Sequence, residues 1–230
     1  MKGEKTMAEY RYALFDFDGT VGDTKYSVMA SAAKALEHYG ISADEKDLKR
    51  FVGPNLWYSF GTFYGFDKPT QDEAVKIYRD YYAREGIYKA VLYPGMDKML
   101  LGLRQSGIKT AIATIRTETS LEQNLTHMGI KELFDATAGS LENGERSDKA
   151  QLIEYVLGKL GSPKIEECVF IGDSHTDYEG AKAMGMDFIA ALHDRPESEF
   201  EGLPIVFKAF SVEEIARIIY EGKAQTLECV

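Results

Sequence analysis

The sequence predicts an α/β protein, in which a doubly wound parallel sheet carries a small all-helical insert after its first strand. Apolar runs of strand length alternate with helix-like segments over most of the chain. These runs are apolar along their whole length, as are strands of a parallel sheet that is covered on both faces. The right-handed crossover rule makes such a sheet doubly wound. Residues 24–91 contain no convincing strand pattern. We therefore expect an α/β core domain of residues 1–23 and 92–230 and a helical domain of residues 24–91.

The insert is expected to hold several helices. The first covers Lys25–Tyr39, where apolar residues recur at helical spacing until Gly40 ends the pattern. Capping boxes at Ser42–Glu45 and Thr70–Glu73 predict the starts of two more helices. Between them, the aromatic stretch "RFVGPNLWYSFGTFYGF" is expected to be helical after Pro54.

The core is expected to alternate between strands and helices. The predicted strands are "IKTAIAT" (Ile108–Thr114), "DATAGS", "CVFIGDS", "DFIAALH" and a weaker "PIVF". The predicted helices are Met96–Ser106, one capped by Thr119–Glu122, Asp148–Leu160, one that ends at Ala183, and a last one capped by Ser211 and Glu214. In open sheets of this type, ligands bind at the carboxyl ends of the strands.

Composition excludes several classes of function. The 230 residues are 44% hydrophobic and 28% charged, which is typical of a globular protein. The net charge of −10 argues against nucleic-acid or anionic-membrane partners, which require a basic face. An anionic substrate would therefore need positive charge supplied locally at its site.

Cysteine usage and the start of the chain suggest a cytoplasmic protein. Cys168 lies in an apolar strand pattern and Cys229 is the penultimate residue, so a disulfide framework is not expected. No apolar run approaches the length of a membrane span. The polar start "MKGEKTMAEY" lacks the core of a signal peptide, and Met7 is an alternative start.

The stretch "YALFDFDGTVGDT" places two aspartates at the end of the first predicted strand. Residues two apart in a strand share a face, so Asp16 and Asp18 should point the same way. Two adjacent like charges cost free energy unless a cation or a proton lies between them. A turn at Asp18-Gly19 explains one aspartate but leaves Asp16 unexplained. A positively charged group is therefore expected at this position.

Other polar side chains follow the predicted strands or open helices at the same edge of the sheet. Thr114 ends "IKTAIAT", Asp173 ends the "CVFIGDS" strand with Asp177 four residues later, and Lys149 opens a helix in "RSDKAQ". Singly, each has an ordinary structural explanation, such as a helix cap, a turn or a solvated lysine. Together they favour a functional site. Carboxylate oxygens without a cluster of His or Cys favour Mg²⁺ over zinc.

Competing motifs are weak. "GLRQSGIK" lacks the lysine of a phosphate loop, and no G-x-G-x-x-G follows a strand. His38 and His127 lie in helical patterns. His175 and His193 lie near the predicted edge and are interpreted as bystanders.

With these motifs in order, the chain resembles the haloacid dehalogenase superfamily over essentially its whole length. "DFDGTVGDT", "ATIR", "SDKAQ" and "GDSHTD" look like the four motifs of that superfamily. The helical insert, with "FVGPNLWYSF", resembles the small cap of the phosphoglycolate phosphatase-like branch.

The resemblance implies catalytic roles for four residues. Asp16 would be the nucleophile that forms an aspartyl-phosphate. Asp18 would be the general acid that protonates the leaving oxygen and then the base that activates water. Thr114 and Lys149 would bind the phosphoryl oxygens.

The resemblance also implies a metal site, and the neighbouring residues include candidates for substrate contacts. Mg²⁺ would be held by Asp16, by the backbone carbonyl of Asp18 and by Asp173, with Asp177 supporting the loop. The second motif departs from the usual Asn-Lys continuation, since Ile115 and Arg116 follow Thr114. Arg116 is therefore a candidate for supplying charge to the substrate. In the cap, Asn55, with its neighbours Phe51 and Trp57, is the candidate for substrate selection.

The expected function is hydrolysis of a small phosphorylated metabolite, a phosphoglycolate-like or sugar phosphate monoester, by a Mg²⁺-dependent monomer or homodimer. Dehalogenase and phosphonatase branches lack the second aspartate, so Asp18 argues against both. A sugar-phosphate mutase is disfavoured because Val28 stands where that branch has a cap-hinge histidine. A pyrophosphatase and an inactive phosphate-sensing protein are the remaining alternatives, although the latter would commonly have lost Asp16 or Asp173.

Overall fold

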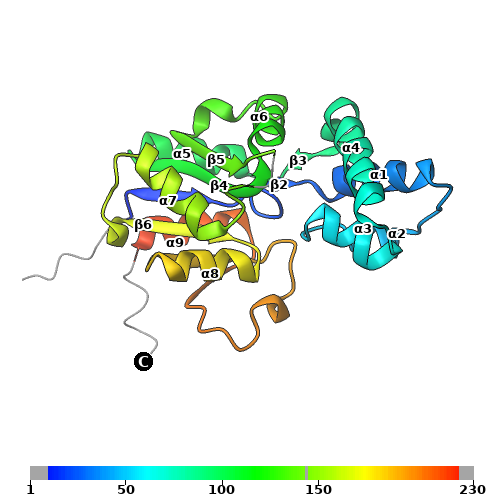
Figure 1. Ribbon diagram of the computed structural model, residues 1–230. Helices are drawn as coiled ribbons and strands as arrows, with labels where there is room; N and C mark the ends of the chain where they lie inside the picture. Colours follow the sequence, from blue (N-terminus) through cyan, green and yellow to red (C-terminus); the bar gives the residue numbers. More distant parts are fainter. Residues whose placement is uncertain (1–9, 143–144, 223–230) are drawn as a thin grey trace, which may run out of the picture. The chain divides into compact units, whose positions relative to one another are not determined.

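A computed structural model describes residues 10–142 and 145–222 of the chain. They form an α/β fold around a parallel sheet of strand order β5-β4-β1-β6-β7-β8, which confirms the predicted fold class (Figure 1). The strands are β1 (Tyr12–Phe15), β4 (Lys109–Thr117), β5 (Ala136–Ser140), β6 (Cys168–Gly172), β7 (Asp187–Ala191) and β8 (Phe207–Ala209). The order changes direction at β1, which pairs with β4 on one side and β6 on the other. This is the switch point at which α/β sheets bind ligands.

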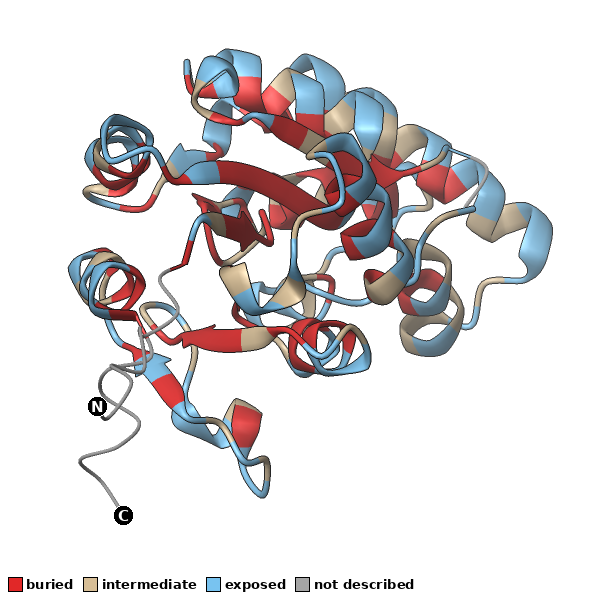
Figure 2. Cartoon of the chain, turned by 90° about the vertical axis from the view of Figure 1, so that its left-hand side faces the viewer, coloured by how far each residue is buried: buried red, intermediate tan, exposed pale blue. Residues whose placement is uncertain are grey.

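Helices cover both faces of the sheet. Side chains of α5 (Met96–Gln105), α6 (Glu118–His127) and α9 (Val212–Glu221) share one apolar core with Ala13 and Phe15 of β1. Those of α7 (Lys149–Lys159) and α8 (His175–Ala183) share the other core with Leu14. The strands are accordingly buried along most of their length (Figure 2). A sheet enclosed in this way exposes functional groups mainly beyond its strand ends.

The described residues divide into two compact units, residues 10–21 with 92–142 and 145–222, and residues 22–91. The second unit contains α1 (Lys25–His38), α2 (Glu45–Lys49), α3 (Leu56–Tyr64), α4 (Lys68–Arg84) and the 3-10 helix η1 (Gly86–Lys89). The aromatic stretch supplies part of its core, where the rings of Phe51 and Phe60 meet edge to face with centroids 5.0 Å apart. Two-residue strands β2 (Gly22–Asp23) and β3 (Val91–Leu92) pair where the chain enters and leaves this unit.

Several expected boundaries were wrong, and most errors concern helix starts. Asp44, not Ser42, caps α2, and Asp67, not Thr70, caps α4. In both helices an aspartate carboxylate accepts the hydrogen bond of the backbone N–H three residues later. Helix α6 begins one residue before Thr119. Strand β8 begins at the last residue of "PIVF".

The remaining elements are the 3-10 helices η2 (Lys131–Leu133), η3 (Ile165–Glu167) and η4 (Glu197–Phe200). Cys168 is a buried free thiol, whereas Met7 and Cys229 fall outside the described residues. Among the helices that the structure describes, none has the length and hydropathy needed to cross a bilayer.

Candidate active site

Asp16 directly follows β1 and keeps the backbone pairing of the sheet. Its N–H donates to the carbonyl of Ile171 in β6 at 2.9 Å, although β1 itself ends at Phe15. The Asp16 side chain is buried, whereas Asp18 is partly exposed, with 35% of its side chain accessible. Phe15 and Phe17 enter the same apolar core, as the alternation of the motif predicts. The two aspartates thus extend beyond the central strand with very different access to solvent.

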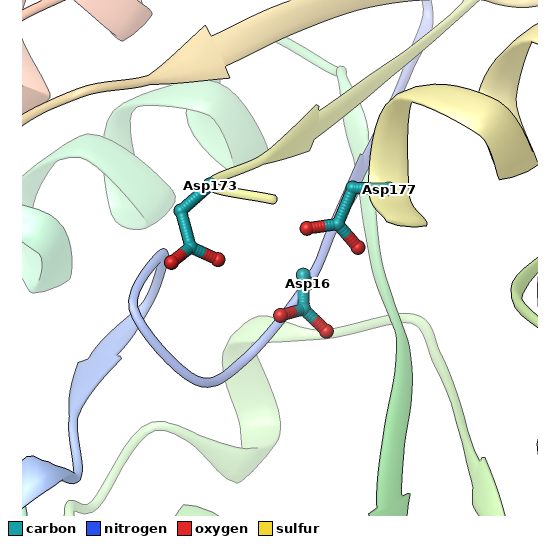
Figure 3. A group of neighbouring side chains, drawn as sticks. All are labelled: Asp16, Asp173 and Asp177. Atoms are coloured by element: carbon teal, nitrogen blue, oxygen red, sulfur yellow. The ribbon is translucent and has the colours of Figure 1, made fainter. Parts of the chain in front are cut away.

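Asp173 and Asp177 come from the end of β6 and the first turn of α8. Ser174 caps that helix in a capping box, in which its hydroxyl and its backbone N–H both donate to Oδ2 of Asp177, at 2.7 and 3.1 Å. The carboxylates of Asp16, Asp173 and Asp177 converge, and one oxygen from each lies within 4.8 Å of the others (Figure 3). All three side chains are buried.

Lys149, the first residue of α7, is buried among these carboxylates. Its Nζ lies 2.7 Å from Oδ1 of Asp16 and 2.8 Å from Oδ1 of Asp177, and it also donates to the carbonyl of Ala113 at 3.2 Å. Gly180 of α8 makes room for it, since a Cβ there would lie 2.5 Å from the Lys149 side chain. The solvated-lysine interpretation is therefore excluded, and only one Asp16 oxygen is occupied by Lys149.

Arg116 contacts Asp18 with two nitrogens. Its Nε donates to Oδ2 of Asp18 at 2.9 Å, its Nη2 donates to Oδ1, and its Nη1 donates to Oγ of Ser120 at 2.8 Å. The sequence singled out both Arg116 and Asp18 but not their pairing. A forked pair of this kind fixes the orientation of a carboxylate as well as its position.

Thr114 lies inside β4 rather than at its end, which corrects the expected boundary. The strand continues to Thr117, with a shift in its pairing to β5 between Ala113 and Thr117. Within this irregular stretch the Oγ1 of Thr114 accepts a bond of 3.3 Å from the N–H of Arg116. Irregularities of this type redirect side chains near active sites.

Sequence reasoning missed Arg195, which follows β7 and reaches the same edge. Its Nε donates to Oδ2 of Asp173 at 2.7 Å. The only signal in the sequence was a charged residue shortly after the predicted "DFIAALH" strand, and no motif supported it.

Burial dominates the electrostatics of the aspartates. It raises the pKa of Asp16 to about 6, against the opposing effect of Lys149, and the pKa of Asp173 to about 7, against that of Arg195. Burial also lowers the pKa of Lys149, but the Asp16 and Asp177 carboxylates outweigh this effect and the net shift is upward. Ionised Asp16 and Asp173 are therefore costly without further positive charge.

The aspartate cluster fits a divalent cation. Its three members offer hard oxygen ligands, no Cys or His belongs to the group, and their raised pKa values indicate a deficit of positive charge. Oδ2 of Asp177 accepts hydrogen bonds from Ser174, and its Oδ1 forms an ion pair with Lys149. Asp16 and Asp173 are thus the better candidates for direct ligands, with Asp177 as a supporting residue.

Two glycines permit this close approach. Gly19 adopts φ +81°, and a Cβ on it would lie 2.2 Å from Oδ2 of Asp173. A Cβ on Gly172 would lie 2.4 Å from Cβ of Asp177. The small residues of the first and fourth motifs therefore serve to admit the carboxylates.

The remaining candidates have structural roles of their own. Asn55 caps α3, where its side-chain oxygen accepts from the N–H groups of Trp57 and Tyr58. The His193 ring packs against Tyr93 at an interplanar angle of 58°, with centroids 4.1 Å apart, and burial lowers the pKa of His193. A substrate role for Asn55 stays a prediction.

The parallel sheet, with a buried carboxylate cluster beyond its central strands, has the architecture of an α/β enzyme, and the cluster is its candidate active site. The model of the haloacid dehalogenase-like hydrolases matches residues 13–191, and the chain belongs to that family. The resemblance deduced from the four motifs is thereby confirmed.

Individual relatives carry different names. Tyrosine-protein kinase PtkA of Mycobacterium tuberculosis is 32% identical over 206 residues, which cover 88% of this chain and 70% of that protein. A 5'-nucleotidase of Pseudomonas aeruginosa is 34% identical over 180 residues, covering 77% and 80%. A phosphoglycolate phosphatase of Mesorhizobium japonicum is 28% identical over 218 residues, covering 90% and 95%.

Among solved structures, a predicted phosphatase from Clostridium acetobutylicum superposes with a TM-score of 0.85 at 30% identity, covering 93% of this chain and 100% of that one. The expected class of enzyme, a phosphatase of the haloacid dehalogenase-like hydrolases, agrees with the family and with the phosphatases among these relatives.

Proposed function

We propose that this protein is a Mg²⁺-dependent phosphatase that hydrolyses small phosphorylated metabolites through an aspartyl-phosphate on Asp16. One observation supports the proposal above all. The carboxylates of Asp16, Asp173 and Asp177 are buried close together, and Lys149 contacts one oxygen of Asp16. Because Lys149 contacts Oδ1 of Asp16, Oδ2 is left as the nucleophilic oxygen.

In this mechanism, Oδ2 of Asp16 attacks the phosphorus while the bond from phosphorus to the ester oxygen breaks. Asp18 gives its proton to the departing oxygen. Asp18 then takes a proton from water, the water oxygen bonds to phosphorus, and the bond to Asp16 breaks to release phosphate. Lys149 and Thr114 are proposed to bind phosphoryl oxygens.

A divalent cation held by Asp16, the carbonyl of Asp18 and Asp173 would supply charge neutralisation for the dianionic phosphoryl group. Asp16 is buried and Asp18 is partly exposed, which supports the role of Asp16 as nucleophile and of Asp18 as acid and base. A buried carboxylate keeps water from competing for the phosphorus, whereas an exposed one can exchange protons with solvent.

The direct test measures phosphate release from a panel of phosphate monoesters, nucleotides and pyrophosphate, with Mg²⁺ and with excess chelator. We expect turnover only with Mg²⁺ and none from Asp16→Asn on any substrate. Because one relative is named a tyrosine-protein kinase, a parallel reaction should contain labelled ATP and a tyrosine polymer. Label on tyrosine without release of free phosphate would contradict the proposal.

The helical unit is proposed to select the substrate, since a cap that closes over a phosphoenzyme would exclude bulk water. Asn55→Ala would remove a helix cap as well as an amide, so Asn55→Ser, which retains a capping oxygen, is the better variant. Unchanged relative rates across the panel would exclude Asn55 as a selector.

A further inference from the structure

The cations at the carboxyl edge of the sheet are mostly engaged by the protein itself. Lys149 is held by two carboxylates and a carbonyl. Arg116 uses three nitrogens on Asp18 and Ser120, and Arg146 contacts the carbonyl of Gly139 and the Glu118 carboxylate. In a chain of net charge −10, these contacts leave few uncommitted donors among the described residues for a second anionic group beside the phosphoryl group.

Arg195 is engaged at one end only. Its Nε donates to Oδ2 of Asp173, whose side chain is 2% exposed, while the Arg195 side chain is 31% exposed. Within residues 10–142 and 145–222, neither Nη group of Arg195 has a hydrogen-bond partner. The guanidinium is therefore anchored beside a candidate metal ligand, and its two Nη groups carry four N–H donors that no described residue accepts.

We propose that Arg195 binds a second anionic group of the substrate, next to the phosphoryl group that Asp16 attacks. The inference rests on the proposed phosphatase function and narrows its substrates to phosphate compounds with another carboxylate or phosphate. A planar guanidinium matches such groups with two parallel hydrogen bonds. The bond to Asp173 holds the side chain in place beforehand, which reduces the entropy lost when the substrate binds.

The proposed contact can be assigned within one compact unit. Arg195 lies between β7 and β8, and Asp173 follows β6, so both belong to the unit that carries Asp16. If Arg195 only neutralised Asp173, its loss would slow all substrates alike. If it binds the second anion, its loss must discriminate between substrates.

The test compares kcat/KM for phosphoglycolate with that for 2-hydroxyethyl phosphate, which has a hydroxyl in place of the carboxylate. Pyrophosphate forms a second arm and separates recognition of a phosphate from recognition of a carboxylate. For at least one of the two-anion substrates, Arg195→Met should reduce the ratio of its kcat/KM to that of 2-hydroxyethyl phosphate by roughly 10- to 100-fold. This is the range expected for a hydrogen bond between charged groups. Arg195→Lys should restore part of the preference, since it keeps the charge but loses the fork.

The matched control is Arg217→Met, which removes the same charge from an exposed position on α9. Calorimetric binding of phosphoglycolate and inorganic phosphate to Asp16→Asn, with and without Arg195→Met, measures the contact without turnover. The inference would be overturned if Arg195→Met lowered kcat/KM equally for substrates with one and with two anionic groups. It would also be overturned if phosphoglycolate bound equally well to Asp16→Asn with and without Arg195→Met. Absence of phosphate release from every substrate by the wild-type protein would instead overturn the proposed phosphatase, and the binding measurement would still decide the role of Arg195.

Discussion

Arg116 holds the carboxylate of Asp18 by both oxygens. If Asp18 is the acid and base of the reaction, Arg116 acts through it as a positioning residue. Arg116→Met should then lower kcat on the order of 10²-fold, the cost of misplacing a catalytic group by about 1 Å, with little change in KM. Arg116→Lys should recover little, because an ammonium cannot form the fork. A rise in KM at unchanged kcat would instead assign Arg116 to substrate binding.

Substitution of Asp16 and substitution of Asp18 should impair the reaction at different steps. Asp18→Asn should slow alkyl phosphate hydrolysis roughly 10²–10⁴-fold, because an alkoxide must be protonated as it leaves. Nitrophenolate needs no proton, so an aryl phosphate should still phosphorylate Asp16, and the phosphoenzyme should accumulate. Rapid mixing should show a burst of nitrophenol near one per site with phosphate retained on the protein. Equal slowing of aryl and alkyl esters without a burst would refute this assignment.

Removing the buried ammonium should destabilise the protein. Lys149→Met leaves the Asp16 and Asp177 carboxylates buried without it, and breaking a buried ion pair in this way costs about 3–5 kcal/mol. Urea unfolding at pH 8 in chelator measures the loss. Lys182→Met, at an exposed position of α8, should change the free energy of unfolding by less than about 0.5 kcal/mol. A similarly small effect of Lys149→Met would contradict the buried geometry.

Asp173 should lower the stability of the metal-free protein above neutral pH. Burial raises its pKa from 3.8 in the unfolded chain to about 7, so between these values the folded state binds more protons than the unfolded state. The contribution of Asp173 to stability therefore falls as the pH rises through this range. Asp173→Asn should remove that decline and raise the unfolding midpoint at pH 8 in chelator.

Thermal unfolding in the presence of Mg²⁺ tests the Asp173→Asn variant in a second way. Mg²⁺ should raise the thermal midpoint of the wild-type protein and have far less effect on Asp173→Asn. Metal-free Asp173→Asn that is less stable than the wild type at pH 8 would show that its bond to Arg195 outweighs the cost of burial.

Gly19 should be required at the metal site because it lacks a Cβ, in addition to its positive φ. Gly19→Ala places a Cβ 2.2 Å from Oδ2 of Asp173, so the carboxylate must move and the Mg²⁺ concentration for half-maximal activity should rise at least about 10-fold. Gly107→Ala is the control, because Gly107 has a similar φ of +78° and no atom within 4 Å of its Cβ position. If Gly107→Ala raises the Mg²⁺ concentration for half-maximal activity as much as Gly19→Ala does, backbone strain alone explains the increase.

The sequence predicted the sheet and the clustering of polar side chains at its carboxyl edge well, because both follow from regular patterns. Uniformly apolar strands indicate a covered parallel sheet, and polar residues beyond them must share its carboxyl edge. Asp16, Asp173 and Lys149 were located by this argument, and the structure brings them together.

The parts that were missed depend on contacts between segments distant in sequence. Arg195 is one charged residue in an irregular loop, and only the fold places it 2.7 Å from Asp173. The pairing of Arg116 with Asp18 likewise joins positions 98 residues apart. The helix starts at Asp44 and Asp67 were misplaced for a local reason, since Ser or Thr with a following Glu competes with a nearby Asp for the same capping role.

The pairing of β2 with β3 has an evolutionary consequence. The chain leaves the sheet-bearing unit at residue 21 and returns at residue 92, and the two short strands between which the helical unit is inserted lie side by side. An insertion with adjacent ends can be lengthened, shortened or exchanged at little entropic cost to the host fold. The contacts among Asp16, Lys149, Asp173 and Arg195 all lie within the host unit. The insert can therefore change in length or sequence without breaking these contacts.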